Sequence, residues 1–315
     1  MSPAANRRGI LAMLAAMLCF LSNDTLLKLA SASLQPGEIM AVRGAFATMM
    51  ALGIVAATGG LRHVKKLGSP FVLLRAGLES CVAFLFITSL AQLPIANITA
   101  ITQSTPILMT LAMVMLGLER VRWRRWTAIL TGFAGVLVIV RPGIEGFNVY
   151  ALVAVAAAVL VAARDIVTRF VPGEVPSTVV TLSTTSAVGL AGFVAGLGES
   201  WHWLAPREFV FILGAAVLVT LGNLAVIVAF RGTDVSVVGP FRYSVILWAI
   251  LSGFAVWGEL PDPIAFVGIA LIVGSGVYTA RRAGLRSSEP STTWLEHDPK
   301  KWEPVFGKDH APAKR

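Results

Sequence analysis

The sequence has little charge and almost no cysteine. Only 14% of its 315 residues are charged, against about 25% in a typical soluble domain, so the composition argues against a soluble enzyme. The two cysteines, Cys19 and Cys81, both lie inside apolar runs, and the metal-site spacings CxxC and HExxH are absent. We therefore expect no disulfide, no metal site and no cofactor.

Other absences narrow the function classes. The four histidines lie outside the apolar runs, whereas an intramembrane enzyme usually needs clustered carboxylates or a site centred on His or Ser. No GxxxxGK[ST] loop is present for ATP-driven transport. A selectivity filter of a channel would need a ring of repeated ligands, and the sequence does not suggest one. An enzyme, an ATP-driven pump and a channel are all disfavoured.

Long apolar runs dominate what is present. Hydrophobic residues make up 56% of the chain, the mean hydropathy is +0.76, and a spanning helix needs about 20 mostly apolar residues. The sequence thus predicts an all-α membrane protein with ten transmembrane helices, five of them starting at or beside a proline. Their expected ranges are 10–30, 37–57, 70–90, 95–116, 126–141, 150–170, 177–197, 209–230, 236–257 and 264–280. Because Asn23, Asp24 and Lys28 interrupt the first run, we interpret it as a span and not as a cleavable signal peptide.

Basic residues predict the orientation. The chain has 26 Lys and Arg against 17 Asp and Glu, and the excess falls at the ends of apolar runs, where it orients a membrane protein, so no nucleic acid is expected. Loops on one side carry nine basic residues: Arg62, Lys65, Lys66, Arg120, Arg122, Arg124, Arg125, Arg169 and Arg231. Those on the other carry Arg141 and Arg207. The positive-inside rule then puts both termini in the cytoplasm.

The chain also contains an internal repeat. An offset of 140 residues aligns each span of the first half with one of the second, with Pro36 on Pro176 and Ser104 on Ser244. The expected units are 1–141 and 142–282, each with five spans, so the second is inverted, an arrangement typical of secondary transporters. Residues 283–315 are expected to form a disordered cytoplasmic tail, or alternatively a surface-lying helix marked by two tryptophans.

Several motifs resemble a known family. The stretch Pro36–Arg43, the Gly-Leu-Glu at 117–119, the Trp-Gly-Glu at 257–259, Gly132 and Gly135 together resemble the EamA family of the drug/metabolite transporter superfamily, over residues 8–282. The resemblance implies a ten-helix inner-membrane carrier with a central cavity. Residues 241–244, 248–249 and 258–262 are similar to a subgroup that includes bacterial riboflavin and S-adenosylmethionine carriers.

Charged residues inside spans are costly and are functional candidates by default. Asp24 and Arg43 each lie about 9 Å inside the outer end of their spans and can pair with each other, either as a helix-to-helix contact or for substrate or proton binding. Arg75 and Glu79 have the i, i+4 spacing of a local pair. Lys28 lies close enough to the outer boundary to snorkel. Glu119 and Glu259 close their spans, which favours a capping or gating-loop role.

Neutral side chains complete the candidate substrate site, which comprises Asn97, Thr102, Gln103, Arg242, Tyr243 and Trp248. Pro106 removes a backbone bond and frees a carbonyl near Thr102 for a substrate, or it marks an ordinary packing kink. The repeat register places Gln103 opposite Arg242 and Tyr243.

The sequence therefore predicts a secondary transporter that moves a small organic metabolite by alternating access. Excess positive charge and aromatic walls favour a planar, electron-rich substrate. Together with the resemblance to the riboflavin and S-adenosylmethionine subgroup, this makes import of a vitamin such as riboflavin the first hypothesis. Export of amino acids or drug-like metabolites is the alternative. Coupling to protons and a homodimeric state both stay open.

Overall fold

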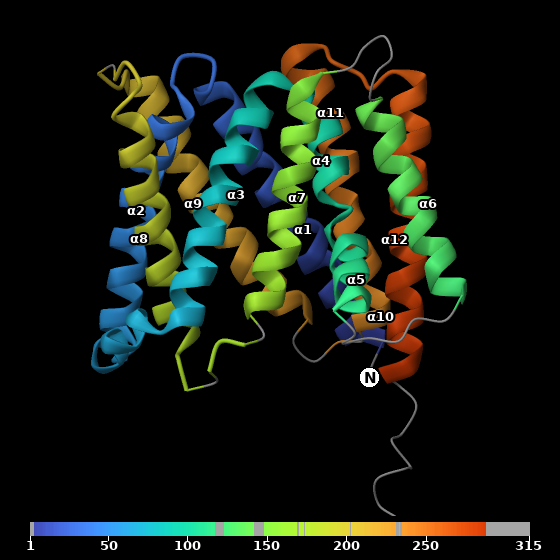
Figure 1. The fold of residues 1–315 in the computed structure, drawn as a ribbon, viewed down its shortest axis with the longest axis horizontal. Helices are drawn as coiled ribbons and strands as arrows, with labels where there is room; N and C mark the ends of the chain where they lie inside the picture. Colours follow the sequence, from blue (N-terminus) through green and yellow to red (C-terminus); the bar gives the residue numbers. More distant parts are fainter. Residues whose placement is uncertain are drawn as a thin grey trace, which may run out of the picture.

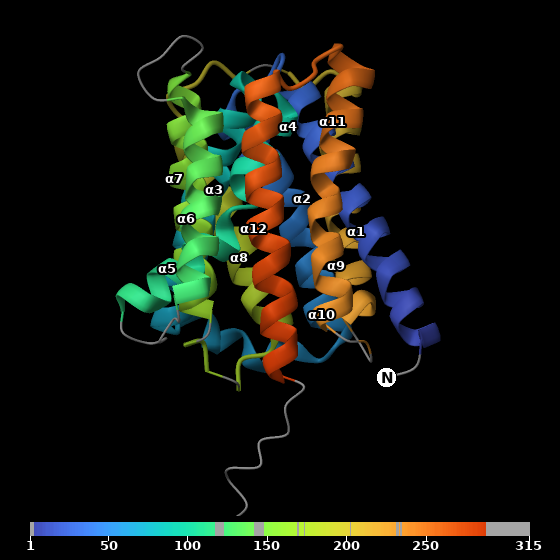
Figure 2. The same ribbon diagram turned by 90° about the vertical axis from the view of Figure 1, so that its right-hand side faces the viewer.

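The protein is a bundle of long helices. The computed structural model describes residues 3–116, 123–141, 148–168, 170–172, 174–201, 203–230, 233 and 235–287. The helices run side by side along one direction, and the start of α1 and the end of α12 lie at the same end of the bundle (Figures 1 and 2). We call this end the basal side and the opposite end the distal side.

The observed helices match the expected spans closely. They are α1 (Pro3–Ala30), α2 (Pro36–Ala57), the 3-10 helix η1 (Gly60–Gly68), α3 (Pro70–Gln92), α4 (Ile95–Thr102), α5 (Thr105–Met115), α6 (Trp123–Val140), α7 (Val149–Thr168), α8 (Ser177–Gly196), α9 (Pro206–Phe230), α10 (Val235–Val238), the 3-10 helix η2 (Gly239–Tyr243), α11 (Ser244–Trp257) and α12 (Pro263–Ser287). Within the described residues, eight segments are long and apolar enough to cross a membrane, and two shorter apolar helices cover 126–140 and 263–278. The chain is therefore a multi-pass membrane protein.

Prolines set the helix starts, as the sequence predicts. Pro36, Pro70 and Pro263 are the first residues of their helices, while Pro94 and Pro176 occupy the position just before the first turn. A proline costs little there because the missing N–H has no partner inside the helix. At the other end of the chain, α12 continues to Ser287. Residues 283–287 are thus helical and not part of the expected disordered tail, whose remainder lies outside the described residues.

Two spans are broken near their middle. The fourth expected span consists of α4 and α5, separated at Gln103 and Ser104, and the ninth consists of α10, η2 and α11, with the change of helix type at Tyr243 and Ser244. The two breaks are related by the 140-residue offset of the repeat. Broken spans leave backbone groups free of helical bonds and are common at transporter sites.

The packing pairs distant parts of the chain. The most extensive contacts join α2 to α8, α1 to α9, α6 to α12 and α3 to α7, while α4 packs on α11. Figure 1 shows α2 beside α8 at one edge, and both views show α6 beside α12. Every one of these contacts joins a helix before residue 141 to a helix after it, so the two halves are interleaved.

Glycines let α2 and α8 approach closely. A Cβ atom on Gly44 would lie 2.5 Å from the backbone nitrogen of Gly189, and a Cβ on Gly192 would lie 2.4 Å from the nitrogen of Ala41. Small residues at a helix crossing are the usual means by which membrane helices pack, because lipid provides no hydrophobic drive between them. The α2–α8 contact therefore depends on these glycines.

A glycine substitution tests this contact. Gly44→Ala should destabilise the protein by about 1–3 kcal/mol, because the added methyl group meets backbone atoms that cannot rotate away. The measurement is the melting temperature of the purified protein in detergent. Gly53→Ala on the same helix is the matched control, since its Cβ would meet nothing within 4 Å. Equal melting temperatures for the two variants would contradict the contact.

Candidate functional site

A cluster of charges joins the middle of α3 to the last turns of α7. Glu79 on α3 accepts a 2.5 Å bond from Arg164 on α7, and the same guanidinium bends back to Asp165 at 2.7 and 3.0 Å. Arg164 and Glu79 are partly buried, with 19% and 25% of their side chains exposed. Because Arg164 bridges two carboxylates, we call these three residues the Arg164 triad.

The expected local pair between Arg75 and Glu79 does not form. Arg75 donates instead to the hydroxyls of Thr168 on α7 and Thr184 on α8, at 3.0 and 2.6 Å, and its interaction with Glu79 is only a longer-range electrostatic one. Spacing along one helix makes the local pair available, but the packing of α3 on α7 brings Arg164 closer to the carboxylate. Arg75 therefore ties three helices together on the basal half of the bundle.

Asp24 on α1 and Arg43 on α2 interact through space without touching. Each acts electrostatically on the other, and Glu79 also acts on Arg43, but no ion pair joins Asp24 directly to Arg43. Asp24 accepts a 2.8 Å hydrogen bond from Asn23, its neighbour in the chain. Arg43 has no hydrogen bond or ion pair with any residue that the structure describes. Both side chains stay partly exposed.

Unpaired polar atoms lie on α1, α4 and α11, and α11 contacts both of the other helices. The buried atoms Asn23 Oδ1, Asn97 Oδ1, Ser244 Oγ and Trp248 Nε1 have no hydrogen-bond partner among the described residues. The helices that carry them are in contact, and Thr25 bonds Ser252 across α1 and α11 at 2.8 Å. Since buried polar groups are almost always hydrogen-bonded, these four atoms are candidates for a binding site. Asn97 and Trp248 were among the expected site residues, whereas Asn23 and Ser244 were not.

The remaining expected site residues lie at the two helix breaks. Gln103 donates a 3.3 Å bond from its side chain to the carbonyl of Arg242, so the breaks meet as the repeat register predicts. The Arg242 side chain is exposed. The carbonyl of Thr102 accepts a 2.6 Å bond from the hydroxyl of Thr105, so the carbonyl expected to be free for a substrate is already bonded within the chain.

Tyr243 is buried in the protein interior. It is 8% exposed and its ring fills a notch at Gly276 on α12, where no larger residue fits. Tyr243 is buried because α12 packs against the break, and this packing cannot be predicted from the spacing of residues in the sequence. We therefore assign Tyr243 to packing between η2 and α12.

On the distal side, Lys28 joins the two halves. Its ammonium donates to the carbonyl of Leu93 at 2.8 Å, pairs with Glu259 at 3.2 Å and lies 4.7 Å from the ring centre of Trp257. Gly258 allows this arrangement because it ends α11 with φ of +68°, a left-handed conformation that glycine adopts without strain. We call the four residues Lys28, Leu93, Trp257 and Glu259 the distal latch.

The distal latch corrects one expectation and extends another. Lys28 is 9% exposed and is held by protein groups, so it does not snorkel to the membrane boundary. Glu259 was expected to cap or gate, and it binds Lys28 of the first half. Its counterpart Glu119 lies outside the described residues.

A second ion pair lies at the start of α12, also on the distal side. Asp262 caps the start of α12 by accepting bonds from the backbone N–H groups of Ile264 and Ala265, both at 2.9 Å, and pairs with Arg141 at the end of α6. Partial burial opposes the charged form, yet these N–H groups and Arg141 hold the pKa of Asp262 below its usual value. Glu199 similarly accepts bonds from the first N–H groups of α2, at Gly37 and Glu38. Carboxylates at helix starts are the signal that sequence reasoning overlooked here.

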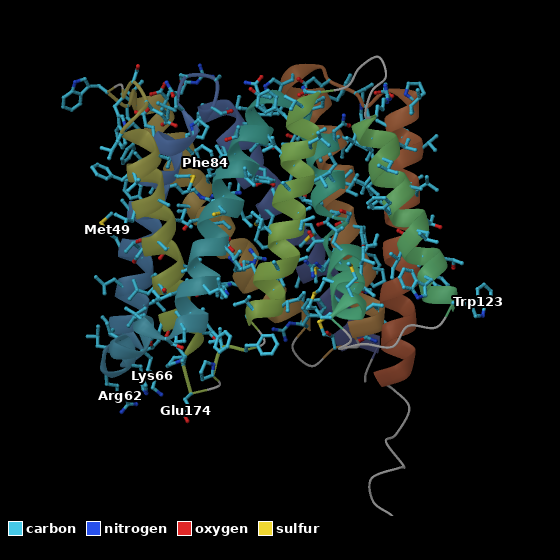
Figure 3. The ribbon with its side chains drawn as sticks, in the orientation of Figure 1. Met49, Arg62, Lys66, Phe84, Trp123 and Glu174 are labelled. Carbon is cyan, nitrogen blue, oxygen red and sulfur yellow. The ribbon has the colours of Figure 1, made fainter. Side chains whose placement is uncertain are left out.

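An apolar cavity of about 420 Å³ lies between α2, α3, α7 and α8. It is lined by Met40, Ser80, Cys81, Phe84, Leu85, Leu160, Ala191 and Ala195, and Phe84 lies between the helices in the distal half of the bundle (Figure 3). Met40 and Leu160 lie about one helical turn from Arg43 and Arg164. None of the expected substrate residues lines this cavity.

Spanning helices, breaks halfway along two of them, and charges deep inside the bundle define a multi-pass membrane protein of the transporter class. The chain belongs to the EamA-like transporter family, whose model matches residues 7–141 and 148–280. The family resemblance in the sequence is thereby confirmed.

Relatives in this family carry different substrate names. The chain is 27% identical over 280 residues to an S-adenosylmethionine uptake transporter of Rickettsia conorii, covering 85% of this chain and 92% of the relative. It is 27% identical to a riboflavin transporter of Vibrio cholerae, with 84% and 90% covered. It is 25% identical to the pseudopaline exporter CntI of Pseudomonas aeruginosa, with 87% and 96% covered. A solved crystal structure with 22% identity matches the fold with a TM-score of 0.59, over 87% of this chain and 98% of that one.

Proposed function

We propose that the chain is a secondary transporter that imports a small organic metabolite with a planar heterocycle across the bacterial inner membrane. The observation that carries this proposal is the set of unpaired polar atoms of Asn97, Ser244 and Trp248 beside the two helix breaks. A heterocycle offers donors and acceptors at its edge for Asn97 and Ser244, while its face stacks on an indole. Gln103 and Arg242 border the same place from the breaks.

The proposed mechanism is alternating access by two inverted five-span units, 1–141 and 142–282. Exchanging the halves by the 140-residue offset turns the α1–α9 contact into the α7–α3 contact, and it maps α2–α8 and α6–α12 onto themselves. This pattern supports a two-fold relation with an axis through the bundle. The site then lies between units that can rock against each other.

The basal side is proposed to face the cytoplasm. Arg62 and Lys66 of η1 lie there beside Glu174, which pairs with Lys66 at 3.1 Å (Figure 3). Arg141 and Arg207 belong to the distal ends of their helices. Basic residues gather on the cytoplasmic side of membrane proteins, and this assignment puts both chain ends inside.

S-adenosylmethionine and riboflavin are the two substrate candidates. Both contain a planar heterocycle, and relatives named for each match most of the chain. Export is the competing direction, favoured by the relative named as a pseudopaline exporter.

Uptake by intact cells tests the proposal. Bacteria that express the chain should take up labelled S-adenosylmethionine or riboflavin in a saturable manner, well above cells with an empty vector. Asn97→Ala and Trp248→Phe should raise the apparent KM at unchanged membrane abundance, because each removes a polar atom that faces the substrate. Collapse of the proton gradient separates coupled import from facilitated diffusion. Loss of preloaded label from the cells, without uptake, would contradict import and favour the exporter.

A further inference from the structure

We propose that Asp24 and Arg43 bind the two charges of an amino-acid-type head group, the ammonium at Asp24 and the carboxylate at Arg43. This inference rests on the proposed transport function and narrows its substrate class to metabolites that carry such a zwitterionic head. The inference is based on the charged residues of α1 and α2.

Arg43 differs from the other basic residues deep in the bundle. Lys28, Arg75 and Arg164 each donate to groups of the protein: the distal latch, two threonine hydroxyls and two carboxylates. Arg43 has no such partner among the described residues, and it is partly exposed halfway along the bundle. A guanidinium in this position is costly unless it is paired. A substrate carboxylate fits it in the bidentate geometry that arginine prefers.

Asp24 supplies the opposite charge. Its only hydrogen bond within the described part of the chain comes from the adjacent Asn23, so oxygen lone pairs are left to accept from an ammonium group. Asp24 and Arg43 feel each other's charge yet form no direct ion pair. Two opposite charges that stay separate can each bind the complementary charge of one zwitterion.

α1 links the two proposed sites, because it carries Asp24 and packs on α11. Thr25, next to Asp24, bonds Ser252 on α11, one turn beyond Trp248, and the side-chain oxygen of Asn23 is itself unpaired. One substrate can therefore place its heterocycle at α4 and α11 and its head between α1 and α2. S-adenosylmethionine has both parts, whereas riboflavin lacks the amino-acid head.

Binding to the purified protein tests the inference apart from transport. The probes are S-adenosylmethionine and its decarboxylated analogue, titrated calorimetrically against the protein in detergent. Loss of the carboxylate should weaken binding to the unaltered protein at least about tenfold, the value of a charge-assisted hydrogen bond. In Arg43→Gln the two probes should bind with nearly equal affinity. Asp24→Asn should weaken both probes and preserve the difference between them.

Arg207→Gln is the matched control, because it removes an exposed arginine that stacks on Phe211 at the start of α9. This variant should keep the full difference between the probes. Equal affinities for the unaltered protein, an unchanged difference in Arg43→Gln, or no binding of S-adenosylmethionine would each overturn the inference. Saturable riboflavin uptake without S-adenosylmethionine binding would overturn it and leave transport standing. Binding without any uptake or efflux would overturn the transport function alone.

Discussion

Replacing Arg164 by glutamine should remove most of the folded protein from the membrane. The substitution leaves the carboxylates of Glu79 and Asp165 facing each other without the guanidinium that bridges them. Breaking a buried pair by removing one partner costs about 3–5 kcal/mol, because the remaining charge is left uncompensated. That is a large part of the stability of most proteins. The measurement is the yield and melting temperature of detergent-solubilised protein.

Neutralising the whole Arg164 triad provides the comparison. The triple variant Glu79→Gln, Arg164→Gln, Asp165→Asn removes the two carboxylates together with the guanidinium that bridges them, so it should be more stable than Arg164→Gln alone. Such a recovery is the sign of coupled residues. If Arg164→Gln melts like the unaltered protein, or if the triple variant is the less stable of the two, the triad does not hold α3 to α7.

Breaking the distal latch should shift the protein toward a state that is open on the distal side. Lys28→Met removes the bond from α1 to Leu93, between α3 and α4, and the bond from α1 to Glu259, just after α11. A charged hydrogen bond is worth about 1.5–3 kcal/mol, which corresponds to a shift of at least about tenfold between two states. A cysteine at Ser244, in a background without Cys19 and Cys81, should then react at least about tenfold faster with an impermeant maleimide added on the distal side.

Two variants calibrate the latch experiment. Glu259→Gln should give a smaller increase in labelling rate, because Lys28 keeps its bond to Leu93 and its contact with Trp257. Arg207→Gln alters a distal arginine outside the latch and should give no increase. An unchanged rate in Lys28→Met would show that the latch does not close the distal side.

Helix positions could be predicted well from the sequence because they depend on local properties. Apolar runs and the prolines at their starts set where α2, α3 and α12 begin, and the structure agrees within a residue at these starts. The break in the fourth span followed from Pro106, yet the η2 break did not, although Pro240 lies within it. A proline does not by itself predict a break in a helix, because prolines are also common at the start of an unbroken helix.

Partners of the charged residues could not be predicted from spacing. The i, i+4 rule proposed Arg75 for Glu79, and the boundary position of Lys28 suggested snorkelling; both were wrong because contacts across helices decide the partner. Arg164 comes to Glu79 only when α3 packs on α7, and Glu259 comes to Lys28 only when α11 meets α1. The direct pair that the sequence suggested between Asp24 and Arg43 does not form either, and their charges interact only at longer range.

Counterflow in proteoliposomes tests the central claim most directly. Vesicles that contain the purified chain and are preloaded with unlabelled S-adenosylmethionine should accumulate the labelled compound transiently above its equilibrium level. A carrier with one site exposed alternately to the two sides gives this overshoot, and Arg43→Gln should lose it while Arg207→Gln keeps it. Entry of label up to equilibrium without an overshoot, or no entry at all from either S-adenosylmethionine or riboflavin, would contradict the account.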